Sequence, residues 1–231
     1  MRALPFLRRH DWLLLMLAAA CIALACVFAA FGADVLAGDH RAMDERLRRW
    51  TVERRSPVGV AIADFISSVG ATEVLVVLAS LVGWLALRRG FAWLAILVVS
   101  AAVSSQYVGL LKRSYDIVRP PTGVAERVSL GFPSGHSSGA AAICVFLGYV
   151  VVRKRRVSVS VATSAGVGTV LLVGLSRIYL DYHWLSDVLG GWMVGTAIGV
   201  GACAVWEWIQ RHQRDDARNP TPPPGATPTR S

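Results

Sequence analysis

Charged residues are scarce in this sequence, and their scarcity is the first guide to its class. Asp, Glu, Lys and Arg make up 17% of the 231 residues, whereas a soluble globular domain carries about 25%. No charge falls within 12–33, 90–111, 157–176 or 188–206. Each stretch is close to the roughly 20 apolar residues that a membrane-spanning helix needs. The composition therefore excludes a soluble enzyme and a disordered chain, and it predicts a polytopic membrane protein.

Cysteine is also scarce, and its placement excludes further classes. The four cysteines lie in apolar stretches and form no CxxC pair: Cys21, Cys26, Cys144 and Cys203. They indicate neither a disulfide framework nor a metal site, and no cofactor is expected. The net charge of +9 does not indicate a nucleic-acid partner, because the basic residues form short runs between apolar stretches.

Six membrane spans are expected, and together they give an all-α fold. Their approximate ranges are 12–36, 70–87, 91–112, 136–152, 157–177 and 185–209. Residues 39–55 are predicted to form a short amphipathic helix on the membrane surface after the first span. Residues 1–210 are expected to be one membrane domain, and the polar, proline-rich 211–231 a disordered tail.

The number of spans and the basic runs predict an orientation. An even number of spans places both termini on one side, together with the basic runs 88–89 and 153–156. The positive-inside rule assigns such runs to the cytoplasm. The six arginines within 39–55 lie on the opposite side and weaken this bias. We expect a multi-pass protein of the cytoplasmic (inner) membrane with cytoplasmic termini.

Three clusters of polar residues lie beside the spans, where polar groups are costly and therefore indicate function. The first contains Lys112 and Arg119, which are seven residues apart and thus near one face of a helix. Pro120 is expected to end that helix and leave Arg119 in a loop. Two cations on one side can clamp an anion. Taken alone, the pair is better explained as side chains that extend to the lipid interface.

The second cluster, 132–137, stands directly before a span. Ser134 can cap the helix, and Gly135 lets its backbone approach a ligand closely. A helix N-terminus binds anions through its free N–H groups, and His136 is placed to exchange a proton with such an anion. A capped helix beside an incidental histidine is the alternative.

The third cluster, 176–187, places a histidine and an aspartate one helical turn apart. The Asp187 carboxylate is expected to accept a hydrogen bond from one ring nitrogen of His183 and to leave the other nitrogen a better nucleophile. Arg177 adds a cation, and a purely structural His–Asp pair is the alternative. Because alternate loops of a six-span chain share one face, the three clusters are expected to meet around a phosphoryl group.

Together the clusters resemble the signature of the type 2 phosphatidic acid phosphatase superfamily, in its membrane-bound bacterial branch. The signature is Lys-x6-Arg-Pro, Pro-Ser-Gly-His and Ser-Arg-x5-His-x3-Asp, and it is complete here within 112–187. The resemblance implies that His183 attacks phosphorus to form a phosphohistidine while Asp187 orients it. It also implies that His136 protonates the leaving oxygen and then activates water.

The resemblance further implies how the phosphate is held and which substrates are candidates. No metal is needed, and the oxygens are bound by Lys112, Arg119, Ser134, Gly135 and Arg177. The site is expected at the outer face, level with the lipid headgroups. Candidate substrates are undecaprenyl pyrophosphate, phosphatidylglycerophosphate, phosphatidic acid and phosphorylated lipid A. A lipid phosphotransferase, or a non-catalytic lipid-phosphate binder or transporter, is the alternative.

Other residues beside the signature have no assigned role in it. Asp64 and Glu73 lie near or within hydrocarbon, and Trp184 and Trp192 are candidates either for a lipid entrance or for interfacial anchors. Three glycines recur at every fourth position and predict close helix packing within the bundle: Gly191, Gly195 and Gly199. The oligomeric state is not predicted.

Overall fold

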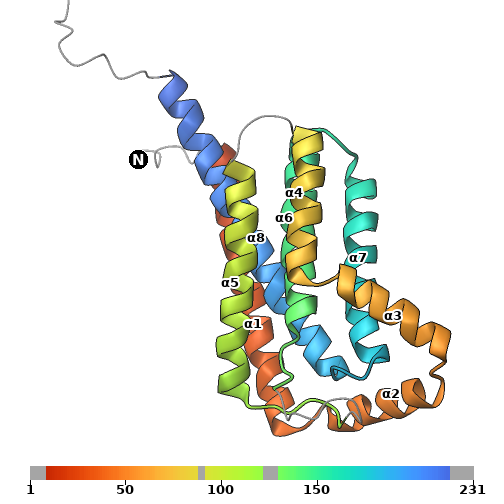
Figure 1. The fold of residues 1–231 in the computed structure, drawn as a ribbon. Helices are drawn as coiled ribbons and strands as arrows, with labels where there is room; N and C mark the ends of the chain where they lie inside the picture. Colours follow the sequence, from red (N-terminus) through yellow and green to blue (C-terminus); the bar gives the residue numbers. More distant parts are fainter. Residues whose placement is uncertain (1–8, 88–91, 122–129, 219–231) are drawn as a thin grey trace, which may run out of the picture.

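Eight helices make up the described part of the protein, which comprises residues 9–87, 92–121 and 130–218 of a computed structural model (Figure 1). Apart from one bridge between Val118 and Leu130, these residues form no strand. The helices are α1 (Arg9–Ala37), α2 (Arg41–Glu53), α3 (Pro57–Val69), α4 (Thr72–Leu87), α5 (Ala92–Tyr115), α6 (Gly135–Arg153), α7 (Val159–Tyr179) and α8 (Leu185–Arg218).

The helices are long and apolar enough to cross a membrane repeatedly. Five pass this test singly, and α3 with the first part of α4 adds a sixth span if the two count as one. Large apolar side chains on α1 are exposed, among them Trp12, Met16 and Ile22. An exposed apolar surface of this extent fits a helix that faces lipid. The expected all-α, polytopic membrane fold is therefore confirmed.

The second span differs from the expectation, which placed one helix over 70–87. A separate helix, α3, begins at Pro57, and the chain bends by 63° before α4 continues from Thr72. The sequence carried the signals for this start, since the Ser56 hydroxyl accepts a hydrogen bond from the N–H of Gly59 at 3.0 Å. A serine N-cap followed by proline is a common helix start.

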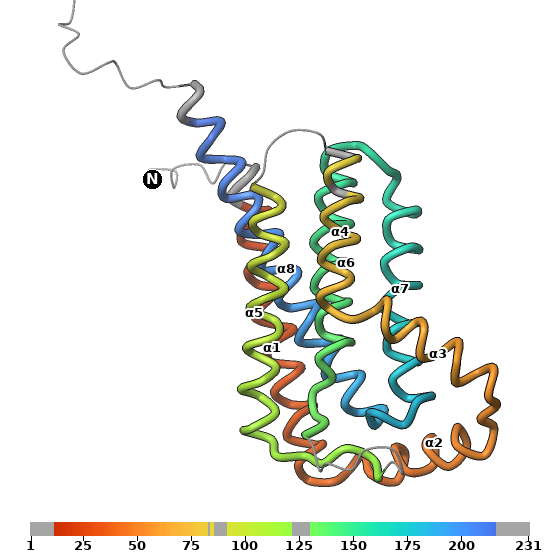
Figure 2. The backbone as a smooth tube through the Cα atoms, viewed as in Figure 1, coloured from red at the N-terminus to blue at the C-terminus, as the bar shows by residue number. Residues whose placement is uncertain are grey.

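Helix α6 lies at the centre of the bundle, where α4, α5, α7 and α8 all pack on it (Figure 2). The glycine ridge of α8 faces α6. A Cβ atom on Gly195 would overlap the carbonyl oxygen of Ser138, and one on Gly199 would lie 2.8 Å from Cβ of Val145. These contacts confirm the prediction that the ridge packs a neighbouring helix within the bundle.

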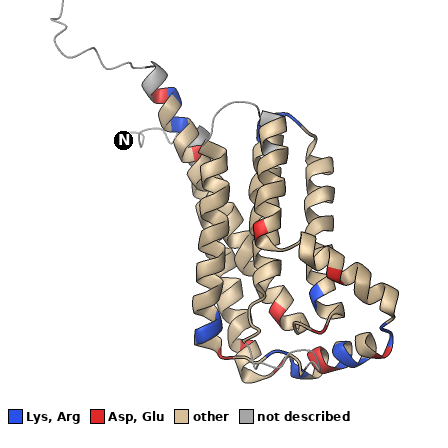
Figure 3. Cartoon of the chain, in the orientation of Figure 1, with Lys and Arg blue, Asp and Glu red and all other residues tan. Residues whose placement is uncertain are grey.

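Helix α2 lies across one end of the bundle, and charged residues are frequent there while the spans carry few (Figures 1 and 3). The sequence predicted a surface helix over 39–55, and the observed helix is slightly shorter. It is more than a surface element, because it packs on α7 and α8 and buries Asp44 and Thr51. This end of the bundle also holds the three polar clusters.

The start of α1 and the end of α8 both lie at the other end of the bundle (Figures 1 and 2). Helix α8 runs to Arg218 and therefore continues past the domain boundary expected at 210. Polar pairs along the helix support this extension, such as Arg211 with Asp215, whose Nε and Oδ2 atoms are 3.9 Å apart. The rest of the expected tail, 219–231, lies outside the described residues.

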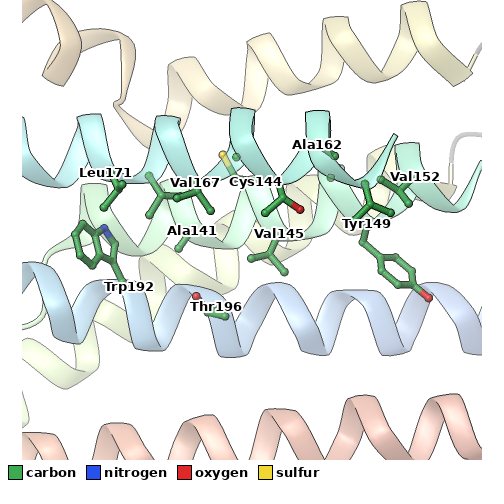
Figure 4. A pocket seen from close by; sticks show the side chains of 15 residues that line it. Ala141, Cys144, Val145, Tyr149, Val152, Ala162, Val167, Leu171, Trp192 and Thr196 are labelled. Atoms are coloured by element: carbon green, nitrogen blue, oxygen red, sulfur yellow. The ribbon is translucent and has the colours of Figure 1, made fainter. Parts of the chain in front are cut away.

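An apolar groove of about 450 Å³ runs between α6, α7 and α8. Figure 4 shows Trp192 and Leu171 near one end and Tyr149 and Val152 near the other. No Lys, Arg, His, Asp or Glu side chain lines it. The lining of the groove therefore offers neither a cation nor an imidazole for a phosphate.

Candidate active site

The two cations of the first cluster converge on one atom. Lys112, in the last turn of α5, donates a hydrogen bond from Nζ to the carbonyl oxygen of Leu130 at 3.0 Å. Arg119 donates from Nε to the same oxygen at 3.3 Å. The helix ends at Tyr115, earlier than the expected end before Pro120, and the next residue adopts a positive φ of 51°. Arg119 thus extends from a loop, as predicted.

The second cluster leads into α6 and is joined to the third through the backbone. Ser134 occupies the N-cap position, and its N–H donates to the carbonyl oxygen of Asp187 at 2.8 Å. The expected side-chain cap is not formed, because the Ser134 hydroxyl accepts from the Ser137 hydroxyl at 3.1 Å instead. Gly135 and His136 open the first turn of α6, where N–H groups have no partner within the helix.

The third cluster contains the expected histidine–carboxylate pair. Nδ1 of His183 lies 3.0 Å from Oδ2 of Asp187, and the N–H of Trp184 donates to the same oxygen at 3.1 Å. Both members of the pair are buried, with exposed fractions of 3% and 0%. A carboxylate on Nδ1 fixes the proton there, so that Nε2 carries the free electron pair.

Burial and charge keep the His183 ring neutral. Loss of water contact lowers the pKa of His183 well below its usual range, and the nearby positive charges of Arg119, Lys112 and Arg177 lower it further. Burial also lowers the pKa of the Arg119 guanidinium, an effect that Asp187 opposes. A neutral imidazole surrounded by cations has the properties that a nucleophile toward an anion requires.

Arg177 supplies the third cation from the last turn of α7. One of its terminal nitrogens, Nη1, donates to the hydroxyl of Ser67 on α3, and its guanidinium lies 4.6 Å from the ring centroid of Tyr182. Its Nε is buried and has no hydrogen-bond partner among the described atoms. A buried donor without a partner is costly, so this nitrogen is available to a bound anion. Helix α3, which was not expected, positions this arginine.

His136 and Glu73 line one small cavity. Its volume is about 260 Å³, and Lys112 and Gly135 also face it. Asp64 is exposed on α3. The structure thus places Glu73 in the lining of a cavity beside candidate site residues, and the Asp64 carboxylate interacts electrostatically with Arg177.

Gly131 is a site residue that the sequence analysis missed. A Cβ atom at this position would lie 2.6 Å from Oδ2 of Asp187, the oxygen that contacts His183. Only a residue without a side chain lets the backbone pass so close to this carboxylate. The glycine stands two residues before Pro133, where the second motif begins, and lies outside every signature position, so no pattern marked it.

A side-chain hydrogen bond joins the loops of the first and third clusters. Trp184 donates from Nε1 to the carbonyl oxygen of Val118 at 2.9 Å. Trp192 instead packs against α7, since a Cβ atom on Gly174 would lie 2.5 Å from its ring. All eight candidate site residues lie on helix ends and loops that these contacts connect. Within the described residues no three His, Cys, Asp or Glu side chains are grouped as metal ligands.

Comparison with known proteins gives a consistent set of relatives. Residues 91–214 match the model of the PAP2 superfamily. Phosphatidylglycerophosphatase B of Bacillus subtilis strain 168 is 30% identical over 163 residues, which cover 67% of this chain and 79% of that protein. Its identity and coverage are high enough to compare whole proteins.

Two solved structures share the fold. The crystal structure of the first transmembrane PAP2 type phosphatidylglycerolphosphate phosphatase from Bacillus subtilis superposes with a TM-score of 0.72 at 24% identity, covering 83% of this chain and 98% of the other. The crystal structure of Aquifex aeolicus LpxE gives a TM-score of 0.53 at 21% identity, covering 68% and 93%. At these identities the likeness is one of fold.

Proposed function

Because this chain belongs to the PAP2 superfamily and is a membrane-embedded lipid phosphate phosphatase of that type, we propose that His183 is its nucleophile. The observation that carries the proposal is the buried His183–Asp187 hydrogen bond of 3.0 Å. The pair lies where the cations of the first cluster also meet, so a phosphate bound by those cations is next to a neutral imidazole.

The proposed reaction has two steps. Nε2 of His183 attacks phosphorus, the bond between phosphorus and the leaving oxygen breaks, and His136 gives that oxygen its proton. His136 then accepts a proton from water, whose oxygen attacks the phosphohistidine and releases inorganic phosphate and neutral His183. Asp187 keeps the proton of His183 on Nδ1 throughout.

The phosphate oxygens are held by groups from all three clusters. Lys112, Arg119 and Arg177 provide positive charge, and the Ser134–Gly135 start of α6 provides N–H groups and the positive end of a helix dipole. Phosphoryl transfer depends chiefly on such positioning and charge stabilisation. The reaction therefore requires no metal ion.

The proposed substrate is a lipid that carries a terminal phosphate. The name of the Bacillus relative favours phosphatidylglycerophosphate among the four candidates. The other three remain undecaprenyl pyrophosphate, phosphatidic acid and phosphorylated lipid A. A phosphotransferase would follow the same first step and pass the phosphoryl group to an alcohol instead of water.

We propose that the protein resides in the cytoplasmic membrane with both termini in the cytoplasm and the site outside. The start of α1 and the end of α8 both lie at the end of the bundle opposite α2, which supports one side for the termini. Cysteines introduced in 41–49 of a cysteine-free protein would then react with a membrane-impermeant maleimide in intact cells. Reaction of cysteines placed after residue 210 instead would contradict this orientation.

Phosphate release from detergent-purified protein tests the function. The four lipids are supplied one at a time with EDTA present, for the intact protein and for His183→Ala. We expect release by the intact protein alone, with the highest kcat/KM for phosphatidylglycerophosphate. Binding of lipid without release by folded protein would support the non-catalytic binder, and loss of activity with EDTA would contradict metal independence.

A further inference from the structure

Arg48 of α2 joins the loops that carry two parts of the proposed site. Its Nε donates to Oδ1 of Asp181 at 2.8 Å, and its Nη2 donates to Oδ2 of Asp181 at 2.9 Å. The same Nη2 donates to the carbonyl oxygen of Pro121 at 3.0 Å. Asp181 stands two residues before His183, and Pro121 two residues after Arg119. One guanidinium thus contacts the nucleophile's loop and the phosphate-binding loop.

Asp44, one turn earlier on the same helix, holds the other side of the nucleophile's loop. Its Oδ1 accepts from the N–H of Ser186 at 2.9 Å, and its Oδ2 accepts from the Ser186 hydroxyl at 2.6 Å. Ser186 directly precedes Asp187 at the start of α8. Asp44 is buried although it belongs to an amphipathic helix of strongly charged composition. An acidic side chain buried at a helix N-terminus is a specific contact.

We propose that Asp44 and Arg48, which we call the α2 brace, are positioning residues that hold His183 against the phosphate-binding loop. This inference rests on the proposed function, since it takes His183 as the nucleophile. The brace contacts the chain on both sides of 182–185, through Asp181 and Ser186. Within the described residues, no hydrogen bond or ion pair joins the brace to His183 or to a phosphate-binding side chain, so its effect on the reaction is indirect.

The geometry of Asp181 shows why its loop needs an external contact. Asp181 adopts a positive φ of 61°, an unfavourable conformation for a residue with a side chain, and its carboxylate is buried. The charges that face it are Arg48 and, at 3.9 Å, Arg55, which also donates to the carbonyl oxygen of Tyr179. A buried carboxylate requires such partners. Without Arg48, the Asp181 carboxylate keeps only its longer contact with Arg55, at 3.9 Å, among these charges.

Displacement of the loop would change the rate more than the affinity. Lys112, Arg119 and Arg177 keep hydrogen bonds outside α2, to Leu130 and Ser67, and continue to bind phosphate. The attacking nitrogen, however, must lie within a fraction of an ångström of its in-line position, and a displacement of about 1 Å can cost roughly 100-fold in rate.

The test compares steady-state kinetics of full-length variants in detergent with phosphatidylglycerophosphate as the probe. We expect Arg48→Ala and Asp181→Ala each to lower kcat by at least about 10-fold with KM changed by less than about 3-fold. The double variant should be no slower than the slower single variant, because the two residues form one contact. Arg48→Lys should recover part of the rate, since it keeps the charge but not the two-pronged contact.

The matched control is Arg49→Ala on the same helix. Arg49 is exposed and pairs only loosely with Glu45, at 3.8 Å, so its kcat should stay within about twofold of the intact protein. Ser186→Ala tests the Asp44 contact separately and should also lower kcat. The unfolding midpoint of each variant is measured beside its activity.

Distinct results would overturn the brace and the function. The brace is overturned if Arg48→Ala has an unchanged kcat, or a kcat that falls only in proportion to the folded fraction. It is also overturned if the fold-loss of kcat in the double variant equals the product of the two single fold-losses. Should Arg48→Ala not fold, an unchanged kcat of Ser186→Ala overturns it. Absence of release by the intact protein, or full release by His183→Ala, instead contradicts the proposed function.

Discussion

At the scale of single residues, the site is organised around one carboxylate oxygen. Oδ2 of Asp187 accepts hydrogen bonds from His183 and from the N–H of Trp184, and the backbone at Gly131 passes close beside it. These contacts fix the orientation of the imidazole before any substrate arrives. Preorganised groups of this kind lower the barrier because they need no rearrangement during the reaction.

Replacement of Asp187 tests this tautomer control. In Asp187→Asn the amide can donate a hydrogen bond to Nδ1 of His183, which shifts the ring proton to Nε2 and removes the attacking electron pair. We expect kcat for phosphate release to fall roughly 10³- to 10⁴-fold, as in other histidine–aspartate pairs. Inhibition by inorganic phosphate should persist, because the cations remain. Asp39→Asn, an exposed aspartate at the same end of the bundle, is the control and should keep full activity.

The neutral state of buried His183 predicts a pH dependence of stability. Its pKa in the folded protein lies well below the value of about 6.5 that it has in the unfolded chain. Below that pH the unfolded state therefore binds the proton and the folded state does not, so stability falls as pH falls. The loss from this one group is at most about 1.4 kcal/mol per pH unit.

The unfolding midpoint in detergent at about pH 7.5 and about pH 5.5 measures this effect. The decrease on acidification should be smaller for His183→Asn than for the intact protein. His212→Asn, which alters a histidine at the other end of α8, should behave like the intact protein. Equal decreases in all three proteins would show that His183 is not buried in its neutral form.

At the scale of helices, the glycine ridge of α8 sets how closely α8 and α6 approach. Gly191 and Gly195 face the carbonyl oxygens of Ser134 and Ser138 on α6, with no space for a methyl group. Because Ser134 also donates to the Asp187 carbonyl, this packing holds the second motif against the third. The ridge thus contributes both to stability and to the position of the site.

A single methyl group on this ridge should therefore be destabilising. Gly195→Ala places a Cβ atom against backbone that cannot rotate away, and overpacking of this kind costs about 1–3 kcal/mol. The unfolding midpoint in detergent should fall. Gly168→Ala on α7, where no atom lies within 4 Å of a new Cβ, is the matched control. A midpoint for Gly195→Ala as high as that of the control would contradict the close packing.

The elements differed in how far the sequence could predict them. The spans could be predicted because apolar length alone defines them. The glycine ridge could be predicted because its spacing matches the helical repeat. Ser56 and Pro57 are a recognisable serine N-cap and first-turn proline for α3, but the expected apolar span began only at residue 70. The contacts of Asp44 and Arg48 could not be predicted, because they join residues more than 70 positions apart in the chain and follow no local pattern.

At the scale of the whole molecule, the bundle separates lipid-facing surface from a charged end. The spanning helices carry few charged residues and expose apolar side chains, while α2 and the three motifs share one end (Figure 3). Under the proposed function, a lipid phosphate would meet the site at the level where its own headgroup lies. The convergence of the motifs was predictable from the alternation of loops, whereas the cover formed by α2 was not.

The most direct test of the central claim is to identify the residue that carries the phosphoryl group. The intact protein is mixed with phosphorus-labelled phosphatidylglycerophosphate, quenched in alkali within a fraction of a turnover, digested and analysed by mass spectrometry. Nucleophilic attack by His183 predicts phosphohistidine at that position, and none in His183→Ala. Label on another residue, or rapid phosphate release with no labelled histidine, would contradict it.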